Sequence, residues 1–253
     1  MKKYELTEET IDMYGRTLYR IKALRDFGDV KAGDLGGFVE SEDNLCHYGT
    51  AWVHDNARVH GDACIFDDAQ VYGNAQVQGN ANVCSNARIL DNAWVYGNAC
   101  VSDSARVVNN ARVFGNACVY DDAWVSNNAR VYGDAYVWGY AQVDKYASIY
   151  GNAEIWGSAH ISESACVGGF ASIGNNADIV RRADFLVVGS IGSRNDNTTF
   201  YRTGNAQIWV SCGCFSGDIL EFLKAVDETH GENKHGQMYR LACELAKMQI
   251  DLT

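Results

Sequence analysis

The sequence predicts an all-β solenoid built from triangular coils, each made of three hexapeptides. Alanine recurs at every sixth position from Ala51 to Ala183 without an insertion. Two residues after each alanine, from Val53 to Ile179, comes a branched aliphatic residue, and a turn rich in Gly, Asn and Asp follows it. A period this strict gives every hexapeptide the same structural role. Three hexapeptides then form one 18-residue coil, and the 23 alanines form between seven and eight coils.

The composition suits a folded solenoid without a membrane segment. The chain is 47% hydrophobic, enough for a buried core, and it contains no proline, a residue that would remove hydrogen bonds from a sheet. No apolar run follows residues 1–5, and no stretch approaches the ~20 apolar residues of a membrane span. We therefore expect neither a signal peptide nor a membrane partner.

Cysteine usage and net charge restrict the compartment and the partners. The nine cysteines are odd in number and mostly scattered over repeat positions, which indicates free thiols in a reducing cytoplasm. The net charge of −11 argues against duplex nucleic acid or an anionic membrane as the main partner. It is compatible with a small anion held by a local arginine cluster.

Residues 1–44 lack the repeat and are expected to cap the first coil. Thr17–Leu24 alternates like a strand, and Asp34–Gly37 is interpreted as a turn. A solenoid needs such a cap because its open end would expose both the core and an unpaired strand edge.

Residues 45–188 form the predicted solenoid. Alternation directs each Val or Ile inward and its two neighbours outward, while the small alanine fits beneath a corner. Gly, Asn and Asp fill the corner because they tolerate the backbone conformations of a sharp bend. This pattern resembles the left-handed parallel β-helix of hexapeptide-repeat proteins, an exception to the usual right-handed crossover.

The repeat departs from the hexapeptide acyltransferases in one respect. Those enzymes usually interrupt their coils with loops that carry a catalytic histidine, whereas this repeat has no interruption. His54, His60 and His160 occupy outward repeat positions and are interpreted as surface residues. We therefore predict no catalytic residue, with an acyl- or nucleotide-sugar transferase as the enzymatic alternative.

Positions three hexapeptides apart should stack on one side of the prism, which groups the outward residues into columns. One side carries an aromatic column beside a tryptophan and two arginines, and the next side carries a second aromatic column. These residues are Tyr96, Phe114, Tyr132 and Tyr150 beside Trp94, Arg112 and Arg130, and then Tyr120, Trp138 and Trp156. Two such aromatic surfaces that meet at one edge usually mark a site of contact with another protein chain or a ligand.

Two compatible interpretations of these columns stand side by side. In the first, neighbouring prisms press the aromatic sides together in a homotrimer. In the second, the groove between subunits stacks planar ligand rings on Trp94, Tyr132 and Trp138. Arg112 and Arg130 would then hold a phosphate or carboxylate.

A ββαα module is predicted over residues 189–253. Before it, Phe185–Val188 is interpreted as the last inward strand of the solenoid, and Gly189–Asp196 as a connecting loop. Strands at Thr199–Arg202 and Ala206–Ser211 precede two helices, the first capped by Ser216. The first helix buries Ile219, Phe222, Leu223 and Val226, and the second, near 236–250, buries Tyr239, Leu241, Ala242, Leu245 and Met248.

This module offers a second candidate site. Cys212-Gly213-Cys214 with His230 and His235 lacks the spacing of a standard zinc site, so we predict no metal and favour a buried thiol pair. A cationic pocket is the alternative, formed by Arg194, Tyr201, Arg202, His230, Lys234 and His235. No cofactor is predicted, and both this pocket and the inter-subunit groove stay open as ligand sites.

Several short motifs carry a further resemblance. They are Leu18-Tyr19-Arg20-Ile21, Gly36-Gly37-Phe38, the Tyr-Gly-Asn-Ala repeats, Gly192-Ser193-Arg194-Asn195-Asp196 and Cys212-Gly213-Cys214. With this layout the chain resembles, over essentially its full length, a family of uncharacterised phage and prophage hexapeptide proteins. The resemblance implies a viral or prophage setting inside a bacterial cell.

Three hypotheses about function follow. The favoured one is a non-enzymatic oligomeric binding protein that captures a small anionic, nucleotide-like ligand and so sequesters a signal of host defence. The others are the transferase named above and a structural or assembly module whose carboxy-terminal part docks to another protein.

Overall fold

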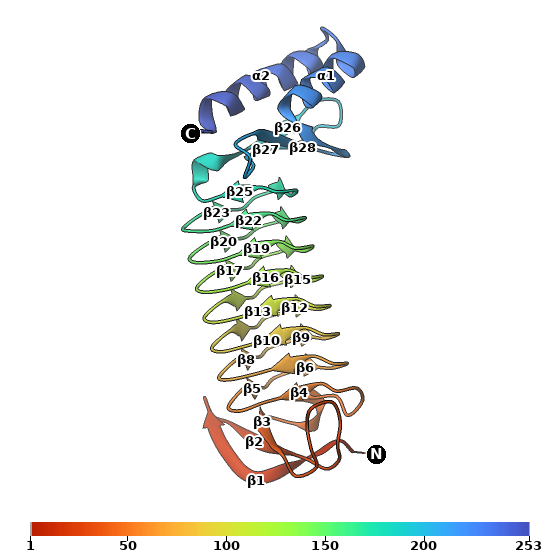
Figure 1. Ribbon diagram of the computed structural model, residues 1–253, viewed down its shortest axis with the longest axis vertical. Helices are drawn as coiled ribbons and strands as arrows, with labels where there is room; N and C mark the ends of the chain where they lie inside the picture. The colour runs from red at the N-terminus through yellow and green to blue at the C-terminus, as the bar shows by residue number, and fades with distance from the viewer. Residues whose placement is uncertain (1, 253) are drawn as a thin grey trace.

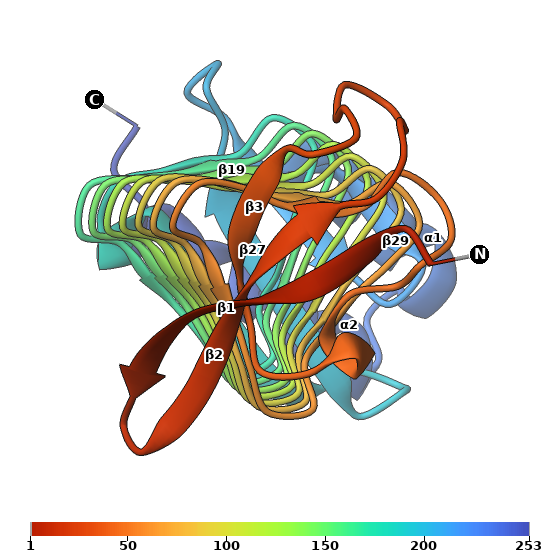
Figure 2. The same ribbon diagram turned by 90° about the horizontal axis from the view of Figure 1, so that it is seen from below.

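The computed structural model describes residues 2–252 as a three-sided prism of parallel strands with a cap at each end (Figure 1). Seen from below, the coils superpose as a rounded triangle (Figure 2). Strands three repeats apart pair in parallel register, so that Trp94 pairs with Arg112 and Arg112 with Arg130. The predicted solenoid with 18-residue coils is confirmed.

Each side of the prism is a stack of two-residue strands, and we call the three sides the first, second and third face. The first face holds β5 (Arg58–Val59), β8 (Gln76–Val77), β11 (Trp94–Val95), β14 (Arg112–Val113), β17 (Arg130–Val131), β20 (Ser148–Ile149) and β23 (Cys166–Val167). The second face holds β6 (Cys64–Ile65), β9 (Asn82–Val83), β12 (Cys100–Val101), β15 (Cys118–Val119), β18 (Tyr136–Val137), β21 (Glu154–Ile155) and β24 (Ser172–Ile173). The third face holds β4 (Trp52–Val53), β7 (Gln70–Val71), β10 (Arg88–Ile89), β13 (Arg106–Val107), β16 (Trp124–Val125), β19 (Gln142–Val143), β22 (His160–Ile161) and β25 (Asp178–Ile179).

The core of the prism is made by the two invariant positions of the repeat. Every repeat alanine from Ala51 to Ala171 and every repeat aliphatic from Val53 to Ile179 is at most 1% exposed. Because burying one Val or Ile contributes about 1.5–3 kcal/mol, this continuous column holds the coils together. The corners turn through positive φ angles at Gly, Asn and Asp, for example Gly97 at +76° and Asp121 at +55°.

The amino-terminal cap extends the first face. Strands β1 (Tyr4–Met13) and β2 (Arg16–Ala23) form an antiparallel hairpin, and β3 (Leu35–Val39) pairs with β2 and then, in parallel, with β5. The expected turn at 34–37 is therefore mostly strand. A Cβ on Gly36 would lie 2.5 Å from the Val53 carbonyl oxygen, and one on Gly37 2.5 Å from that of Ala57. These glycines serve close packing on the first coil rather than a turn.

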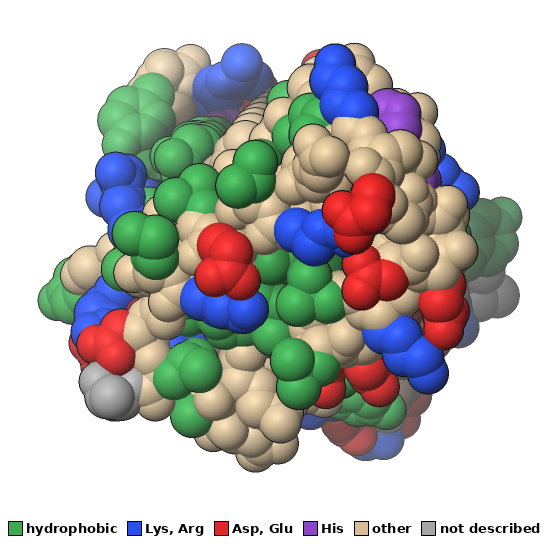
Figure 3. Space-filling model, turned by 90° about the horizontal axis from the view of Figure 1, so that it is seen from above, with side chains coloured by type: hydrophobic (Ala, Val, Ile, Leu, Met, Phe, Trp, Pro, Cys, Tyr) green, Lys and Arg blue, Asp and Glu red, His purple; other side chains and the backbone are tan. Residues whose placement is uncertain are grey.

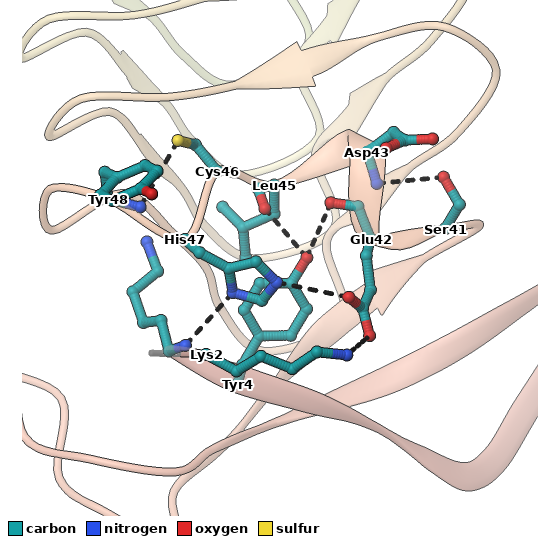
Figure 4. A network of polar contacts seen from close by, with 10 residues as sticks. Lys2, Tyr4, Ser41, Glu42, Asp43, Leu45, Cys46, His47 and Tyr48 are labelled. Carbon is teal, nitrogen blue, oxygen red and sulfur yellow. Dashed lines mark hydrogen bonds and ion pairs between the residues drawn. The ribbon is translucent and has the colours of Figure 1, made fainter.

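A polar network closes the lower end of the core, next to a short 3₁₀ helix at Glu42–Asn44 (Figure 4). The buried Tyr4 hydroxyl lies 2.9 Å from the Leu45 carbonyl oxygen and 3.1 Å from that of Glu42. The Glu42 carboxylate accepts a hydrogen bond of 2.5 Å from Lys2 Nζ, which lowers the pKa of Glu42. The open end of the solenoid is thus covered without leaving this hydroxyl unpaired.

The carboxy-terminal cap is a small α+β module. Strands β26 (Phe185–Ile191), β27 (Asp196–Arg202), β28 (Ile208–Cys212) and β29 (Phe215–Asp218) form an antiparallel sheet in that order. Helices α1 (Ile219–His230) and α2 (Lys234–Gln249) lie at the far end of the molecule (Figure 1). The sheet has two buried sides, because Tyr201 packs with the solenoid core and Phe200 with the helices.

The solenoid ends earlier than its alanine period predicts. Ala183 is exposed in a 3₁₀ helix at Arg182–Asp184, and Phe185–Val188 belongs to β26 rather than to a last coil. The buried Asp184 carboxylate accepts hydrogen bonds from the backbone N–H groups of Val180 at 2.9 Å and Arg181 at 2.8 Å, which fixes a turn out of the repeat. Because β26 runs through Ile191, the expected loop shrinks to a hairpin turn, and the module has four strands instead of two.

The helices also differ from the sequence interpretation. Asp218, not Ser216, caps α1, since its carboxylate accepts from the N–H groups of Leu220 and Glu221 at 2.8 and 2.9 Å. The buried side of α2 is made by Gly236, Tyr239, Ala242, Cys243 and Ala246. These small side chains bring α2 close to the sheet. The larger residues that were expected to be buried are therefore exposed, Leu241 to 71%, Leu245 to 49% and Met248 to 85%.

Candidate ligand-binding site

The aromatic column of the first face is a ladder of stacked rings. Neighbouring centroids in Tyr96, Phe114, Tyr132 and Tyr150 lie 4.8, 4.9 and 5.5 Å apart, with interplanar angles of 2°, 2° and 14°. The coil spacing sets this distance, so each ring covers the next. An inner ring such as that of Tyr132 therefore offers only its rim to a ligand. A planar ligand would have to separate two coils to enter.

The other columns are also ordered by contacts within the chain. The Arg112 guanidinium lies 5.1 Å from the Trp94 ring centroid, and Trp138 stacks on Tyr120 with centroids 5.7 Å apart. Arg112 and Arg130 are exposed, and neither forms an ion pair within residues 2–252. Trp94, Arg112 and Arg130 lie on the first face with Tyr132, whereas Trp138 lies on the second.

A pocket of about 280 Å³ lies in the carboxy-terminal module. Its apolar wall comes from Phe215, Phe222, Val226 and Tyr239, and its polar rim carries Arg194, His230 and Cys214. Phe222 meets Tyr239 edge-on with centroids 5.4 Å apart, and Phe215 lies 5.2 Å from Phe222. A pocket of aromatic wall and few polar groups is typical of small-molecule sites.

The strand turn at the pocket fixes the position of the Tyr239 phenol. A Cβ on Gly192 would lie 1.8 Å from the Tyr239 hydroxyl, so only glycine leaves room for this ring. The hydroxyl lies 3.9 Å from Cys212 Sγ, and burial raises the pKa of Tyr239 to about 12. The phenol is therefore neutral at physiological pH and adds no negative charge to the pocket.

Two nitrogen-bearing side chains stand at the rim. Arg194, in the turn between β26 and β27, has Nη2 4.0 Å from Cys214 Sγ. Within residues 2–252 its guanidinium pairs with no carboxylate. The His230 ring, at the end of α1, lies 5.7 Å from the Tyr239 ring and 5.9 Å from the His235 ring. An anion at this rim would meet the Arg194 guanidinium, whose positive charge no carboxylate neutralises within residues 2–252.

The structure separates the residues that the sequence grouped into one cationic pocket. Arg194 and His230 line the pocket, with His235 next to His230. Tyr201 is fully buried against the solenoid, and Arg202 Nη1 donates to Asp178 Oδ2 at 2.7 Å, so neither reaches the pocket. The expected buried thiol pair is also wrong, because Cys214 is exposed and Cys212 half-buried.

The residues that the sequence missed are the aromatic ones. Phe222 and Tyr239 show helical spacing, which predicts core positions, while Phe215 carries no pattern of its own. They form a wall only because the β28–β29 turn approaches both helices, a tertiary contact without a local signal.

The histidines of the repeat differ in burial. His60 is only 6% exposed, which contradicts its interpretation as a surface residue. His54 is half-buried, with Nε2 2.8 Å from Gln70 Oε1 and its ring stacked on Tyr72. His160 lies on the third face, with Nε2 3.5 Å from Asp144 Oδ1. Across residues 2–252 no three His, Cys, Asp or Glu side chains gather as metal ligands, and no helix is long and apolar enough to cross a membrane.

The comparison with known families concerns the coils. Residues 69–85 match a family model described as the YdcK beta solenoid repeat. The chain is a β-helix repeat protein. The matched segment spans about one coil near the amino-terminal end and does not include the pocket residues. A search of curated proteins finds no match.

Proposed function

We propose that this protein is a non-catalytic binding protein that captures a small anionic, nucleotide-like ligand in the pocket of the carboxy-terminal module. The observation that carries the proposal is Arg194, a guanidinium without a carboxylate partner in the described chain, at the rim of an aromatic pocket. The inner rings of the first-face ladder, Phe114 and Tyr132, have no equivalent position, because neighbouring rings cover both of their sides.

The two sides of the pocket fit the two parts of such a ligand. The wall of Phe215, Phe222 and Tyr239 contacts a planar base. The Arg194 guanidinium donates paired hydrogen bonds to a phosphate or carboxylate, and His230, which also lines the pocket, adds another. A volume of about 280 Å³, near the lower end of the usual range for ligand pockets, favours a ligand of mononucleotide size.

The setting we propose is a phage or prophage protein in the cytoplasm of a bacterial host. Capture of an immune messenger in stoichiometric amounts would protect the phage without any turnover. The full-length resemblance to phage and prophage hexapeptide proteins supports this setting, and the uninterrupted repeat supports binding over group transfer.

A retention experiment tests the pocket. Purified protein is incubated with a panel of cyclic nucleotides and ADP-ribose derivatives, and the retained ligand and its dissociation constant are measured by mass spectrometry and calorimetry. Arg194→Gln should weaken binding at least tenfold, because a charge-assisted contact is worth about 1.5–3 kcal/mol. The matched control is Arg182→Gln, an exposed arginine outside the pocket.

Three results would contradict the proposal. They are no retained ligand from the panel or from a cell lysate, equal binding by wild type and Arg194→Gln, or turnover of acyl-coenzyme A or nucleotide-sugar donors. A loss of binding in Arg112→Gln and Arg130→Gln alone would instead place the ligand on the first face.

We also propose that the protein is a homotrimer through its first and second faces. Exposed and half-exposed aromatic residues on these faces, among them Tyr136 and Trp94, support this proposal. Apolar surface arranged in straight columns suits a repeated contact between identical prisms.

A structural or assembly module is the second candidate, and one observation favours it. Met238, Leu241, Leu245, Met248 and Leu252 follow a spacing of three and four residues along and just beyond α2, and Leu241 and Met248 are the most exposed of them. Hydrophobic side chains do lie between charged ones at this end of the molecule (Figure 3). Copurification of a virion or filament component with the wild type, but not with Met248→Glu, would support this function instead.

A further inference from the structure

A second hollow lies at the opposite end of the molecule, between the β1–β2 hairpin and the first coils. The hairpin extends beyond the triangular outline of the coils (Figure 2), and its tip stands beside them (Figure 1). The cleft measures about 430 Å³. Met13, Tyr14 and Arg16 of the hairpin form one wall, and His60, Gln78 and Tyr96 of successive coils form the other.

His60 is an unexplained polar group in this cleft. It is 6% exposed, and its Nε2 atom is buried without a hydrogen-bond partner in the described chain. Leaving a buried polar atom unpaired is costly, and such atoms usually have a partner that the chain alone does not supply. Burial and the nearby Arg16 charge lower the pKa of His60, so the imidazole is neutral at physiological pH. A neutral ring nitrogen either donates or accepts, according to its tautomer.

Tyr96 supplies a flat apolar surface above this histidine. It is the first ring of the ladder, and Phe114 covers only the side that faces the carboxy-terminal end. The next position down the column, one coil earlier, is Gln78, which has no ring. Apart from Gly97 beside it, the other coil residues of the cleft, including His60, come from earlier coils, so Tyr96 meets the cleft on the side that Phe114 does not cover.

The charges of the cleft do not favour an anion. Arg16 Nη1 lies 2.9 Å from both Glu40 carboxylate oxygens, and Glu40 Oε2 also accepts a 2.7 Å hydrogen bond from the Gly61 N–H. The positive charge of Arg16 is therefore already neutralised. Asp62, which also lines the cleft, is exposed and adds a negative charge. The unused groups are uncharged, namely the His60 imidazole, the Gln78 amide and the Tyr96 ring.

We propose that this cleft binds an uncharged planar heteroaromatic compound of the nucleobase or nucleoside class, which packs against the Tyr96 ring on the side that Phe114 does not cover. The heteroaromatic edge hydrogen-bonds His60 Nε2 and the Gln78 side chain. The site is independent of the carboxy-terminal pocket, because it shares no residue with it and selects a neutral ligand instead of an anion.

The test uses adenine, adenosine and guanosine as probes, with binding to the full-length protein measured by calorimetry. Tyr96→Leu should weaken binding about tenfold or more, as expected for loss of one base–aromatic stack. The matched control is Tyr150→Leu, which removes the ring at the other end of the same ladder and lies outside the cleft. Binding by Tyr150→Leu should match the wild type.

A second variant separates binding from folding. His60→Leu should lose affinity while its melting temperature stays equal to or above that of the wild type, because the unpaired nitrogen is removed. Adenosine should in turn raise the melting temperature of the wild type but not of His60→Leu. Absence of binding of all three probes to the wild type at millimolar concentration would overturn the proposal. So would equal affinities in the wild type, Tyr96→Leu and His60→Leu.

Discussion

At the scale of single residues, Lys3 shows how a buried charge couples folding to pH. Its side chain is fully buried at the lower end of the core, where Nζ donates to the Ala51 carbonyl oxygen at 2.7 Å and lies 5.1 Å from the Phe27 ring centroid. Burial lowers the pKa of Lys3 from 10.5 to about 8. Between pH 8 and 10.5 the unfolded chain therefore binds more protons at Lys3 than the folded chain does. The free-energy cost of burying the ammonium is fully present below pH 8 and disappears as the pH rises towards 10.5.

Lys3→Met should reveal this cost. The free energy of unfolding of the wild type should rise by about 2 kcal/mol relative to the variant between pH 7.5 and 9.5, as the Lys3 amine loses its proton in the folded state. Urea unfolding of both proteins at the two pH values measures the difference. Groups other than Lys3 are common to both chains and cancel. A difference that does not change with pH would contradict the prediction.

Arg194 lies in a segment that the sequence interprets as a connecting loop, and the sequence names it only as a member of an alternative cationic pocket. In the structure Arg194 lines the carboxy-terminal pocket. Tyr201 is wrongly grouped with it because strand position alone does not say which side of a sheet faces which core. His60 has an outward position in the repeat, and its burial depends on Met13 and Arg16, which are distant in the sequence. No local pattern contains that contact.

At the scale of elements, the corners between the first and second faces are set by a column of glycines. Gly115 has φ +75°, and a Cβ on it would lie 2.9 Å from the backbone nitrogen of Gly133, one coil further on. Gly169, in the last coil of the same column, has φ +70°, and a Cβ there would have no neighbour within 4 Å. Both glycines adopt a positive φ, but only Gly115 lies so close to the next coil that a Cβ would collide with it.

This pair separates conformational strain from crowding. An alanine at either position costs about 1–2 kcal/mol for the left-handed backbone. Gly115→Ala should lose at least about 1 kcal/mol more than Gly169→Ala, because only the inner coil must move the backbone above it. Free energies of unfolding from urea titrations give the comparison. Equal losses would mean that the column accommodates a methyl group.

The sequence predicts the coils well because every contact that defines them recurs at a fixed spacing. It predicts the carboxy-terminal cap poorly because the contacts that define this cap do not recur at a fixed spacing. Whether Phe185–Val188 joins a coil or a new sheet depends on Asp184, whose carboxylate redirects the chain, and on pairing with β27. The exposed face of α2 is misassigned because Leu241 and Met248 are apolar but the small residues Ala242 and Ala246 pack on the sheet.

At the scale of the whole molecule, the proposed trimer makes a direct prediction. Analytical ultracentrifugation should give a mass three times that of the 27.8 kDa chain. Tyr136→Glu, on the second face at 42% exposure, should dissociate the trimer by placing a charge in the contact. Tyr48→Glu is the matched control, because Tyr48 is exposed between the amino-terminal cap and β4, outside the first and second faces. A single-chain mass for the wild type at all concentrations would exclude the trimer.

The parallel register of the coils has a consequence for the distance between the two ends. Each cap packs on the terminal coils, while the inner coils contact only their neighbours in the stack. The number of 18-residue units therefore acts as a ruler between the hairpin cleft and the carboxy-terminal pocket. Adding or removing one unit changes their separation by about 4.8 Å and leaves the chemistry of both ends as it was. Length and binding are in this sense separate properties of the chain.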